Sequence, residues 1–588
     1  MGKGVFRTVL AFFCAFSMLA SGCEDTHVCS YDCKVITDDY LKVSATCQDK
    51  ARYYYSCSCG AKGETSFTHG EILEHDYSAK VELGQYLKKP ANCQKPATYY
   101  HSCTMCGKSG STTFTTGTVK EHSYTREVKK AEYLKQEPTF ETEAVYYKSC
   151  ACGLAGTDTF LGDKLRVHTE EEKLLYKPTS LTVTLYDAQN SIYGFTYNTT
   201  NEPLRPVLQI QQGDAFSDGY EEYEANYEVQ KTYDATDKAV DYYIVKVQVA
   251  LNPNTTYTYK AYDKYADVGS APAKLQTKNV QATTFSFAHV SDSQTYVTST
   301  DKVGTGTGSY FSQTLSQIVD TNDFILHTGD FVEWSKYESY WKAMIDDNFS
   351  YLSKIPVMAI SGNHETTYRS GSNETYKHFH YKLPEQASTE LGFFYSFVYG
   401  NVKFIMLNTN AVYQNKLKQE QYDWLIGELE NNDCRWTIVS MHNPMYSRGK
   451  YGSDSSKNAL ALGLRSQLKG VFAQYGVDIV LQAHDHLITR TYPIDASGNI
   501  TTESWETDNG VEYTVNPDGV IYMMNGPAGN QSRSDVFNVE TELYKYAYAS
   551  QACSWADFEI SGDALKVAVK YYDGEQVKTY TTWGIKKN

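Results

Sequence analysis

The hydrophobic pattern of the chain changes near residue 285 to one that predicts a layered α/β domain. Short, almost continuous apolar runs appear there: "FSFAHV", "DFILH", "IPVMAI", "WTIVSM" and "VDIVLQA". Runs without alternation are typical of strands covered on both faces. Segments of helical periodicity, such as "SYFSQTLSQIVDT" and "QEQYDWLIGELEN", separate them. Strands that alternate with helices in this way favour the α/β class.

Residues 173–283 show a different pattern, with apolar and polar residues in alternation. The segments "SLTVTLYD", "DYYIVKVQVAL" and "TTYTYKAYD" contain Thr, Tyr and Val at every second position. Several short strands of this kind predict an all-β sandwich of about 100 residues.

The N-terminal quarter repeats with a period of 46 to 47 residues. Three units share the pattern Ala-x-Tyr-Tyr-x-Ser-Cys, followed by a second Cys and a Gly, and they begin at Ala51, Ala97 and Ala144. Tyr-rich alternation and Gly turns predict small β repeats.

The first two repeats each offer three Cys and one His, a set that can close a tetrahedral zinc site. The sets are Cys47, Cys57, Cys59 and His75 in unit one, and Cys93, Cys103, Cys106 and His122 in unit two. The step from the last Cys to the His is 16 residues in both units. Disulfide bonding gives no reason to fix that step, so the spacing favours structural zinc.

The ends of the repeat array depart from this pattern. Unit three keeps Cys150, Cys152 and His168, but Phe140 stands near the place of the first Cys. Cys29 lies 46 residues before the His of unit one, where a truncated leading unit would have its own His. Disulfides, which an exported chain favours, are the alternative to zinc, with Cys29 or Cys33 as partners; a third alternative is neither.

The N-terminus reads as a secretory signal over residues 1–23. Lys3 and Arg7 precede an apolar stretch that is too short for a membrane span, and small residues then precede Cys23. This ending resembles a bacterial lipobox, which would place a lipid anchor on Cys23; plain cleavage is the alternative. We therefore expect an exported protein, a cell-surface lipoprotein of a bacterium.

Length and charge complete this outline. At 588 residues the chain is too long for one core. The boundaries predicted are a signal peptide at 1–23, Cys/His repeats at 24–172, the sandwich at 173–283 and the α/β domain at 284–588. The net charge of −16 argues against a general nucleic-acid binder, which needs a basic face.

The chemistry is concentrated where the five apolar runs end. The polar residues at these ends are Asp292, Gln294, Asp330, Asn363, His364, His442, His484 and His486. Because sites in open α/β sheets form at the carboxyl ends of strands, we expect these groups to converge. Oxygen and imidazole ligands without thiolates suit Zn, Mn or Fe. They are too many for one ion, and Asp330 can bridge two.

Taken one by one, each of these residues reads as an ordinary strand cap. The five sequence blocks that contain them, taken together, resemble a known family. The blocks "SDSQ", "GDFVE", "GNHE", "SMHNP" and "AHDH" are similar, in order, to those of calcineurin-like metallophosphoesterases of the purple acid phosphatase branch. The resemblance implies a four-layer sandwich, in which two mixed sheets are flanked by helices. The preceding segment is similar to the fibronectin type III-like N-terminal domain of plant-type members.

The resemblance also implies roles for these residues. Asp292, Asp330 and His486 would hold one metal ion, and Asp330, Asn363, His442 and His484 the other. His364 would protonate the leaving group, with Glu365 orienting its imidazole. The nucleophile would be a metal-bound hydroxide.

Three departures from the family pattern matter. Glu333 occupies the position of the tyrosinate that gives the family its colour, so an iron-loaded centre should lack the violet band. Gln294 replaces a Gly or His and is either a weak metal ligand or a hydrogen-bonding neighbour. The family's paired substrate histidines are missing, so Arg448 and Lys450 are candidates to bind a phosphate oxygen, unless they belong to a solvated loop.

The sequence thus predicts an exported, acid phosphatase-like enzyme that hydrolyses phosphate esters with two metal ions. Its partners would be a small phosphorylated substrate and, through Cys23, a membrane; no nucleic acid is expected. One alternative is a phosphodiesterase or nucleotide hydrolase on the same site. The other is a surface binding protein whose metallophosphoesterase domain is not catalytic.

Overall fold

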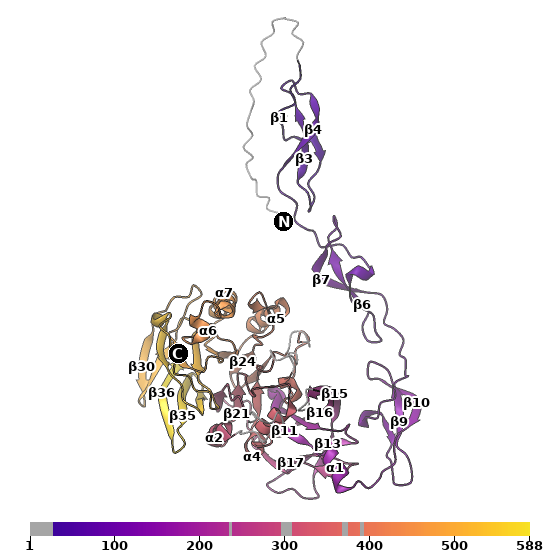
Figure 1. The fold of residues 1–588 in the computed structure, drawn as a ribbon, viewed down its shortest axis with the longest axis vertical. Helices are drawn as coiled ribbons and strands as arrows, with labels where there is room; N and C mark the ends of the chain where they lie inside the picture. Colours follow the sequence, from indigo (N-terminus) through magenta and orange to yellow (C-terminus); the bar gives the residue numbers. More distant parts are fainter. Residues whose placement is uncertain (1–27, 234–237, 296–308, 367–373, 388–392) are drawn as a thin grey trace. The chain divides into compact units, whose positions relative to one another are not determined.

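The computed structural model describes residues 28–233, 238–295, 309–366, 374–387 and 393–588 (Figure 1). The signal segment and Cys23 lie outside the described residues. Contacts divide the chain into two compact units, Met1–Val128 with Tyr146–Phe160, and Lys129–Val145 with Leu161–Asn588. Among the described helices, none is long and apolar enough to span a bilayer.

The first unit is built from the small β repeats. One sheet has the order β1-β3-β2 with β4 beside β3, and the next has the order β5-β6-β7. The strands are β1 (Cys33–Lys34), β2 (Leu41–Val43), β3 (Ala51–Ser56), β4 (Lys62–His69), β5 (Leu87–Lys89), β6 (Ala97–Ser102) and β7 (Ser109–Thr116). The third repeat supplies β8 (Leu134–Gln136), β9 (Val145–Ser149) and β10 (Ala155–Leu161). Each repeat therefore forms one short sheet, as its alternation predicts.

The alternating segment forms two sheets. One has the order β11-β12-β16-β15, and the other has the order β14-β13-β17-β18 with β19 beside β17. The strands are β11 (Thr179–Asp187), β12 (Ile192–Thr199), β13 (Pro206–Gln212), β14 (Glu221–Glu224), β15 (Asn226–Tyr233), β16 (Ala239–Ala250), β17 (Thr256–Asp263), β18 (Val268–Gly269) and β19 (Ala273–Gln276). Alternate residues of β12, such as Phe195 and Tyr197, are buried in their common core. The likeness to fibronectin type III stays a prediction.

The remaining part of the second unit contains two large mixed sheets. The first has the order β22-β21-β20-β34-β35-β36-β31-β30, with β20, β21 and β22 parallel. Its strands are β20 (Thr284–Val290), β21 (Phe324–His327), β22 (Val357–Ala359), β30 (Ser504–Asp508), β31 (Val511–Val515), β34 (Ser554–Ser561), β35 (Ala564–Tyr572) and β36 (Val577–Lys586).

The second large sheet has the order β23-β24-β27-β28-β32-β29-β33, with β24, β27, β28 and β32 parallel. Its strands are β23 (Tyr395–Tyr399), β24 (Val402–Met406), β27 (Trp436–Ser440), β28 (Ile479–Leu481), β29 (Ile488–Thr491), β32 (Ile521–Asn525) and β33 (Tyr544–Tyr548). The hairpin β25 (Val412–Tyr413) and β26 (Lys416–Leu417) stands apart.

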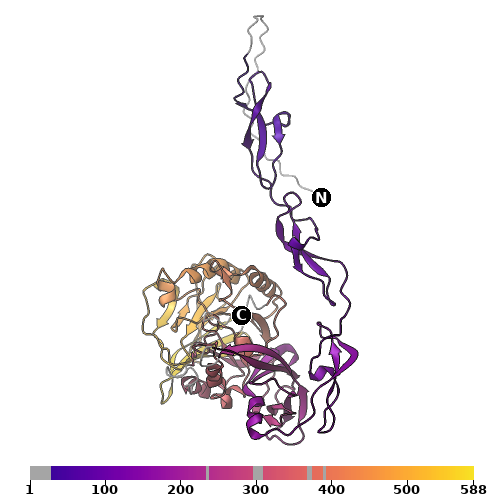
Figure 2. The same cartoon turned by 45° about the vertical axis from the view of Figure 1, so that its right-hand side comes forward.

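The helices are α1 (Glu170–Tyr176), α2 (Ser309–Ile318), α3 (Glu338–Ile345), α4 (Phe349–Leu352), α5 (Gln419–Glu430), α6 (Lys450–Ser453) and α7 (Ala459–Gln474) (Figures 1 and 2). Helix α2 packs on the first large sheet, and α5 and α7 pack on the second. Helices α3 and α4 contact β11 of the sandwich, and α1 contacts β18. Short 3₁₀ helices are η1 (Asp38–Tyr40), η2 (Gly84–Tyr86), η3 (Ala131–Tyr133), η4 (Ala188–Asn190), η5 (Thr375–Lys377) and η6 (Thr541–Leu543).

The strands of the second large sheet are buried on both faces, which explains their unbroken apolar runs. In β27, Trp436 and Ile438 belong to the core shared with the first sheet, whereas Val439 faces the core under α5 and α7. Helix α2 packs against β34 and β35 of the first sheet. The order of layers is therefore helix, sheet, sheet, helix, which confirms the predicted four-layer fold.

Candidate metal centre

The candidate ligands lie in the turns that directly follow β20, β21, β22, β27 and β28. Four of them have left-handed backbone conformations: Asp292 (φ 50°), Asp330 (φ 58°), His484 (φ 74°) and His486 (φ 53°). This region is uncommon for residues other than Gly, and strained residues gather at functional sites. The fold therefore holds these side chains in conformations that an ordinary turn does not need.

Asp330, His442 and His484 form the centre of the site. Their ligand atoms all lie within 4.8 Å of one another. His442 Nε2 is 3.3 Å from Asp330 Oδ2 and 3.2 Å from His484 Nδ1. Asn363 adds its amide oxygen, 2.9 Å from His442 Nε2.

Asp292 and His486 form a second pair beside this group. Their atoms Oδ1 and Nε2 are 3.4 Å apart, and both side chains are buried. The backbone N–H of His484 donates to the Asp292 carboxylate at 3.3 Å, which joins the pair to the first group. The structure thus brings together all six residues expected to hold metal: Asp292, Asp330, Asn363, His442, His484 and His486.

Two of the imidazoles are oriented as metal ligands usually are. His442 Nδ1 donates to the carbonyl of Thr328 at 2.8 Å, and His486 Nδ1 donates to the carbonyl of Gln531 at 2.6 Å. In both rings the backbone bond leaves Nε2 facing the site. Metal-bound histidines commonly have their second nitrogen held in this way, so the donor set fits a metal centre.

The electrostatics of the cluster support the same interpretation. Burial alone would raise the pKa of Asp330, but the charges of His442 and His364 outweigh it and hold that pKa below its usual range. Burial would lower the pKa of His442, yet the Asp330 carboxylate raises it to about 9. Burial and then the charge of His442 lower the pKa of His484 to about 3. Neighbouring groups with such opposed shifts are typical of functional sites.

His364 lies at the edge of this cluster. Its Nδ1 donates to the carbonyl of Glu333 at 2.9 Å, and its Nε2 is 3.8 Å from Asp330 Oδ2. Burial would lower the pKa of His364, but the charge of Asp330 and the Glu333 carbonyl raise it above its usual value. The neighbouring carboxylate therefore stabilises a proton on the ring, and Nε2 faces Asp330.

The sequence predicted that Glu365 orients the His364 imidazole, and the bonds of its carboxylate go to the backbone of two loops. The carboxylate accepts backbone N–H groups from Asp330 at 2.8 Å, Phe331 at 3.0 Å and Gly362 at 2.8 Å. Glu365 therefore ties the loop after β21 to the loop after β22. Its charge also raises the pKa of His364.

Gln294 and Glu333 both contact His364. The sequence suggested a hydrogen-bonding role for Gln294 alone. Gln294 Nε2 lies 3.0 Å from His364 Nε2 and in this orientation donates to the neutral ring. Gln294 Oε1 is buried without a hydrogen-bond partner among the described residues, and exchanging the two amide atoms would let it accept from the protonated ring. Glu333 contributes its backbone carbonyl, a contact that no residue pattern reveals.

Of the two cations that the sequence offered for phosphate, Arg448 is bonded to a distant loop. Its guanidinium donates to the carbonyl of Phe537 at 2.8 Å and to Asn538 Oδ1 at 3.1 Å. Lys450 is exposed at the start of α6, beside Lys457. A phosphate contact by either residue stays a prediction, with a solvated loop as the alternative.

A cavity of about 500 Å³ adjoins the metal ligands instead. Asn363 and His484 line it, together with Thr366, Thr409, Asn410, Ala411, Val412, Lys418, Asn443, Pro444, Tyr451, Lys457, Leu460 and Ala461. The Tyr451 ring lies 4.0 Å from the His484 ring. The cations of the lining are thus Lys418 and Lys457, which sequence reasoning missed because neither stands at the end of one of the five apolar runs.

Asp485 was also missed, although it stands inside "AHDH". Its carboxylate accepts the Ser447 hydroxyl and the backbone N–H of Tyr451. It therefore fixes the loop that brings Tyr451 against His484. Its position between the candidate ligands His484 and His486 was the sequence signal that pointed to a supporting role.

The Cys and His residues of the repeats also gather, but not in the predicted sets. Cys57 and Cys59 lie with Cys29, and Cys47 and His75 lie with the cysteine pair of the following unit. Grouping within each unit was therefore wrong, because the ligands of one repeat lie at opposite ends of its sheet.

Comparison with known proteins agrees with this geometry. Residues 285–487 match the family model described as calcineurin-like phosphoesterase. Human "Acid phosphatase type 7" is 29% identical over 239 residues, covering 37% of this chain and 50% of that protein. "Purple acid phosphatase 23" of Arabidopsis thaliana is 30% identical over 206 residues, covering 34% and 40%. The chain thus spans half or less of these relatives.

A solved structure extends the likeness in fold. Purple acid phosphatase PPD1 from yellow lupin seeds superposes with a TM-score of 0.56 and 16% identity, covering 76% of this chain and 80% of that one. At this identity the likeness concerns the fold alone. The matched family model thus identifies residues 285–487 as a calcineurin-like phosphoesterase domain, and the chain has purple acid phosphatases among its relatives.

Proposed function

We propose that the second unit is a metal-dependent enzyme that hydrolyses phosphate esters. The observation that carries the proposal is the convergence of six metal-binding side chains from five strand ends, with His364 beside them. A binding protein would need the ligands but not an additional imidazole directed toward them. The acid phosphatases among the relatives support the same reaction class.

The proposal assigns two metal ions to this site. Asp292, Asp330 and His486 would hold one, and Asp330, Asn363, His442 and His484 the other. When bound, the two ions would neutralise the phosphate and activate the attacking water. Zn, Mn and Fe all suit this set of oxygen and imidazole ligands.

His364 would supply the proton that the leaving group needs. As the bond between phosphorus and the ester oxygen breaks, Nε2 of His364 transfers its proton to that oxygen. The Glu333 carbonyl keeps Nδ1 protonated and fixes the plane of the ring. Gln294 would steady the same imidazole from the other side.

The cavity indicates what kind of ester fits. Its polar end contains Asn363 and His484, and its far wall is apolar through Val412, Pro444 and Leu460. A phosphate at the polar end would leave its organic group against the apolar wall. Lys457, at the rim, would attract an anionic substrate.

The test is metal-dependent hydrolysis of three substrates: an aryl phosphate, a bis-aryl phosphate and a nucleoside polyphosphate. We expect turnover of at least one that disappears on chelation and returns with added metal. Asp330→Asn should abolish it, whereas Asp433→Asn on the surface should not change it. The preferred substrate separates a phosphomonoesterase from a phosphodiesterase or nucleotide hydrolase. A metal-loaded protein that turns over none of the three would contradict the proposal and favour a surface binding role.

Export is a second part of the proposal, and it depends on the sequence of residues 1–23. The basic start, short apolar stretch and small residues before Cys23 support a lipid anchor at a cell surface. Labelling cells with a fatty acid should mark the wild-type protein but not a Cys23→Ala variant. Unlabelled wild-type protein in the medium would instead indicate plain cleavage.

A further inference from the structure

The cysteines and histidines of the first unit form two four-residue groups that each join successive repeats. The first group is Cys47, His75, Cys103 and Cys106, and the second is Cys93, His122, Cys150 and Cys152. In both groups the four ligand atoms lie within 4.8 Å of one another. Each group takes a Cys and a His from one repeat and two Cys from the next.

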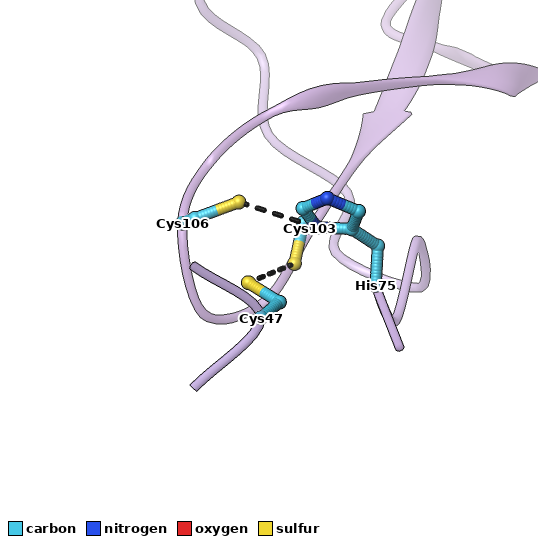
Figure 3. A group of neighbouring side chains, drawn as sticks. All are labelled: Cys47, His75, Cys103 and Cys106. Atoms are coloured by element: carbon cyan, nitrogen blue, oxygen red, sulfur yellow. Dashed lines mark hydrogen bonds between the residues drawn. The ribbon is translucent and has the colours of Figure 1, made fainter. Parts of the chain in front are cut away.

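Three separate pieces of chain build the first group, as Figure 3 shows. Cys47 lies in the loop between β2 and β3, and His75 follows β4. Cys103 and Cys106 flank the turn between β6 and β7 of the next sheet. Cys47 and Cys103 are buried, and His75 and Cys106 are half-buried.

The distances match a bound zinc ion. Cys47 Sγ is 3.6 Å from Cys103 Sγ, and Cys106 Sγ is 3.4 Å from His75 Nδ1. A tetrahedral zinc with Zn–S bonds of about 2.3 Å places its sulfurs about 3.8 Å apart and its sulfur and nitrogen about 3.6 Å apart. A disulfide requires about 2.05 Å.

The second group repeats this geometry one unit later. Cys93 Sγ is 3.4 Å from Cys150 Sγ, and Cys152 Sγ is 3.4 Å from His122 Nδ1. The turn that holds Cys150 closes through a hydrogen bond from Gly153 N to the Cys150 carbonyl at 2.9 Å. The matching turn in the first group has Gly107 N bonded to the Cys103 carbonyl at 2.9 Å.

Successive repeats also contact each other through residues outside the Cys and His groups. Tyr77 packs so closely on Gly110 of the next repeat that a Cβ there would lie 2.8 Å from its ring. Ala79 pairs with Ser102, which continues the sheet of that repeat. One unit later, Tyr124 meets Gly156 and Arg126 pairs with Ser149 in the same way. The two halves of each group are therefore held together by more than the ligands.

The exceptions at the end of the array follow from this arrangement. In unit three, Phe140 replaces the first Cys and is 66% exposed. His168 packs edge-on against Tyr176 of α1, with ring centroids 5.4 Å apart. A site between repeats needs a following repeat, and here α1 follows instead. If each site lay within one unit, nothing would explain why unit three lacks the first Cys but keeps Cys150 and Cys152.

We infer that these two groups are structural zinc sites and that each site links one repeat to the next. Three thiolates and one imidazole are a common closed set for zinc, and the absence of an open position excludes a catalytic role. The sheets are too small to bury much apolar surface, so the metal supplies stability that their cores lack. The array would then be a chain of zinc-linked β modules.

The test compares two matched variants of the full chain, purified without chelator, for their zinc content relative to wild type. Each carries four substitutions that remove at least two ligands from any site they touch. The first is Cys47→Ser, His75→Ala, Cys103→Ser and Cys106→Ser. The second is Cys93→Ser, His122→Ala, Cys103→Ser and Cys106→Ser.

Sites between repeats predict that the first variant loses one zinc and the second loses two. Sites within repeats predict the reverse, and that result would overturn the inference. Unchanged zinc in both variants, or wild-type protein without zinc and without free thiols, would also overturn it. Cys434→Ser, in the other unit, is the control and should lose none.

A measurement on the wild type guards against variants that fail to fold. After metal removal and gentle oxidation, neighbouring thiols should form disulfides that mass spectrometry of a digest can identify. We expect links from Cys47 to Cys103 and from Cys93 to Cys150. Links from Cys47 to Cys57 or Cys59 in their place would show that the sites lie within repeats.

Discussion

At the scale of single residues, His364 is defined by its surroundings more than by its position in "GNHE". The Glu333 carbonyl fixes its Nδ1, and the Asp330 carboxylate favours its protonated form. A tyrosine at position 333 would offer the same backbone carbonyl. The position of the proposed proton donor therefore does not depend on which side chain residue 333 carries.

Replacement of His364 by Ala should lower turnover of an aryl phosphate by a factor of about 10²–10⁴, as expected for the loss of a general acid. The loss should be smaller for esters with acidic leaving groups, because these need less protonation. Steady-state kinetics with a series of aryl phosphates would measure both effects. The metal content should stay at the wild-type value, since His364 is not among the ligands. If the variant hydrolyses every ester as fast as wild type, His364 has another role.

At the scale of elements, the site depends on how two strand-end loops are joined. Glu365 follows β22, yet its carboxylate accepts N–H groups from Asp330 and Phe331 after β21. Gly362 must approach equally closely, because a Cβ there would lie 2.0 Å from Asp330 Oδ1. The bridging position of Asp330 is therefore set by the neighbouring loop.

Glu365→Gln should weaken metal binding while leaving every ligand in place. The amide would turn an N–H₂ group toward backbone N–H donors, so Asp330 would lose its fixed position. Loss of such a supporting contact typically costs 10–100-fold in metal affinity. Metal titration by calorimetry would measure it, with Glu385→Gln on the surface as the control. Equal affinities for the two variants would mean that the loops are held by other contacts.

The hydrophobic pattern predicted the strands and helices well, because the burial of side chains determines that pattern. The runs before Asp292, Asp330 and His442 are strands, and their two-sided burial accounts for their lack of alternation. The ligand types and their strand-end positions followed from the same pattern. Parallel strands bring their carboxyl ends to one edge, which is why distant residues converge.

Contacts that depend on direction or on chain crossing could not be predicted in this way. The sequence places Glu365 beside His364, but its carboxylate also accepts N–H groups from another loop. It places Cys47 and Cys57 in one unit, but the sheet separates them. Arg448 was a candidate for phosphate because of its loop, yet its partner Asn538 comes 90 residues later. The spacing of two residues along the chain predicts their distance in space only when both lie in the same helix, strand or turn.

At the scale of the whole second unit, the sandwich and the metallophosphoesterase domain share one hydrophobic core. Leu181 and Phe195 of the sandwich belong to the same cluster as Phe287 and Trp436. Thr182 and Thr184 on β11 donate hydrogen bonds to the carbonyls at 378 and 380. We therefore expect these two parts to unfold together.

A buried polar group at this junction makes the expectation testable. The Glu338 carboxylate, on α3, accepts hydrogen bonds from His378 Nε2 at 3.0 Å, from the Tyr242 hydroxyl on β16 and from Ser180 Oγ at 3.4 Å. Burial alone would raise the pKa of Glu338, but the charge of His378 and these bonds outweigh it and hold the pKa below its usual value. A carboxyl of lowered pKa stabilises the fold above its unfolded pKa, and that contribution is lost as the pH falls through the folded value.

Glu338→Gln should therefore lower the free energy of unfolding of the second unit at neutral pH by roughly 2 kcal/mol, as for hydrogen bonds to a charged group. The difference from wild type should shrink as the pH falls below the usual carboxyl pKa of about 4.3 and through the lower folded pKa, where the wild-type carboxyl also becomes neutral. Thermal unfolding would measure the loss, and hydrogen exchange would follow amides of β12 in the sandwich and β24 in the catalytic sheet. Because the core is continuous, the slowest amides of both strands should accelerate by the same factor. Faster exchange in β12 alone would show that the sandwich opens independently and that the shared core does not couple the two parts.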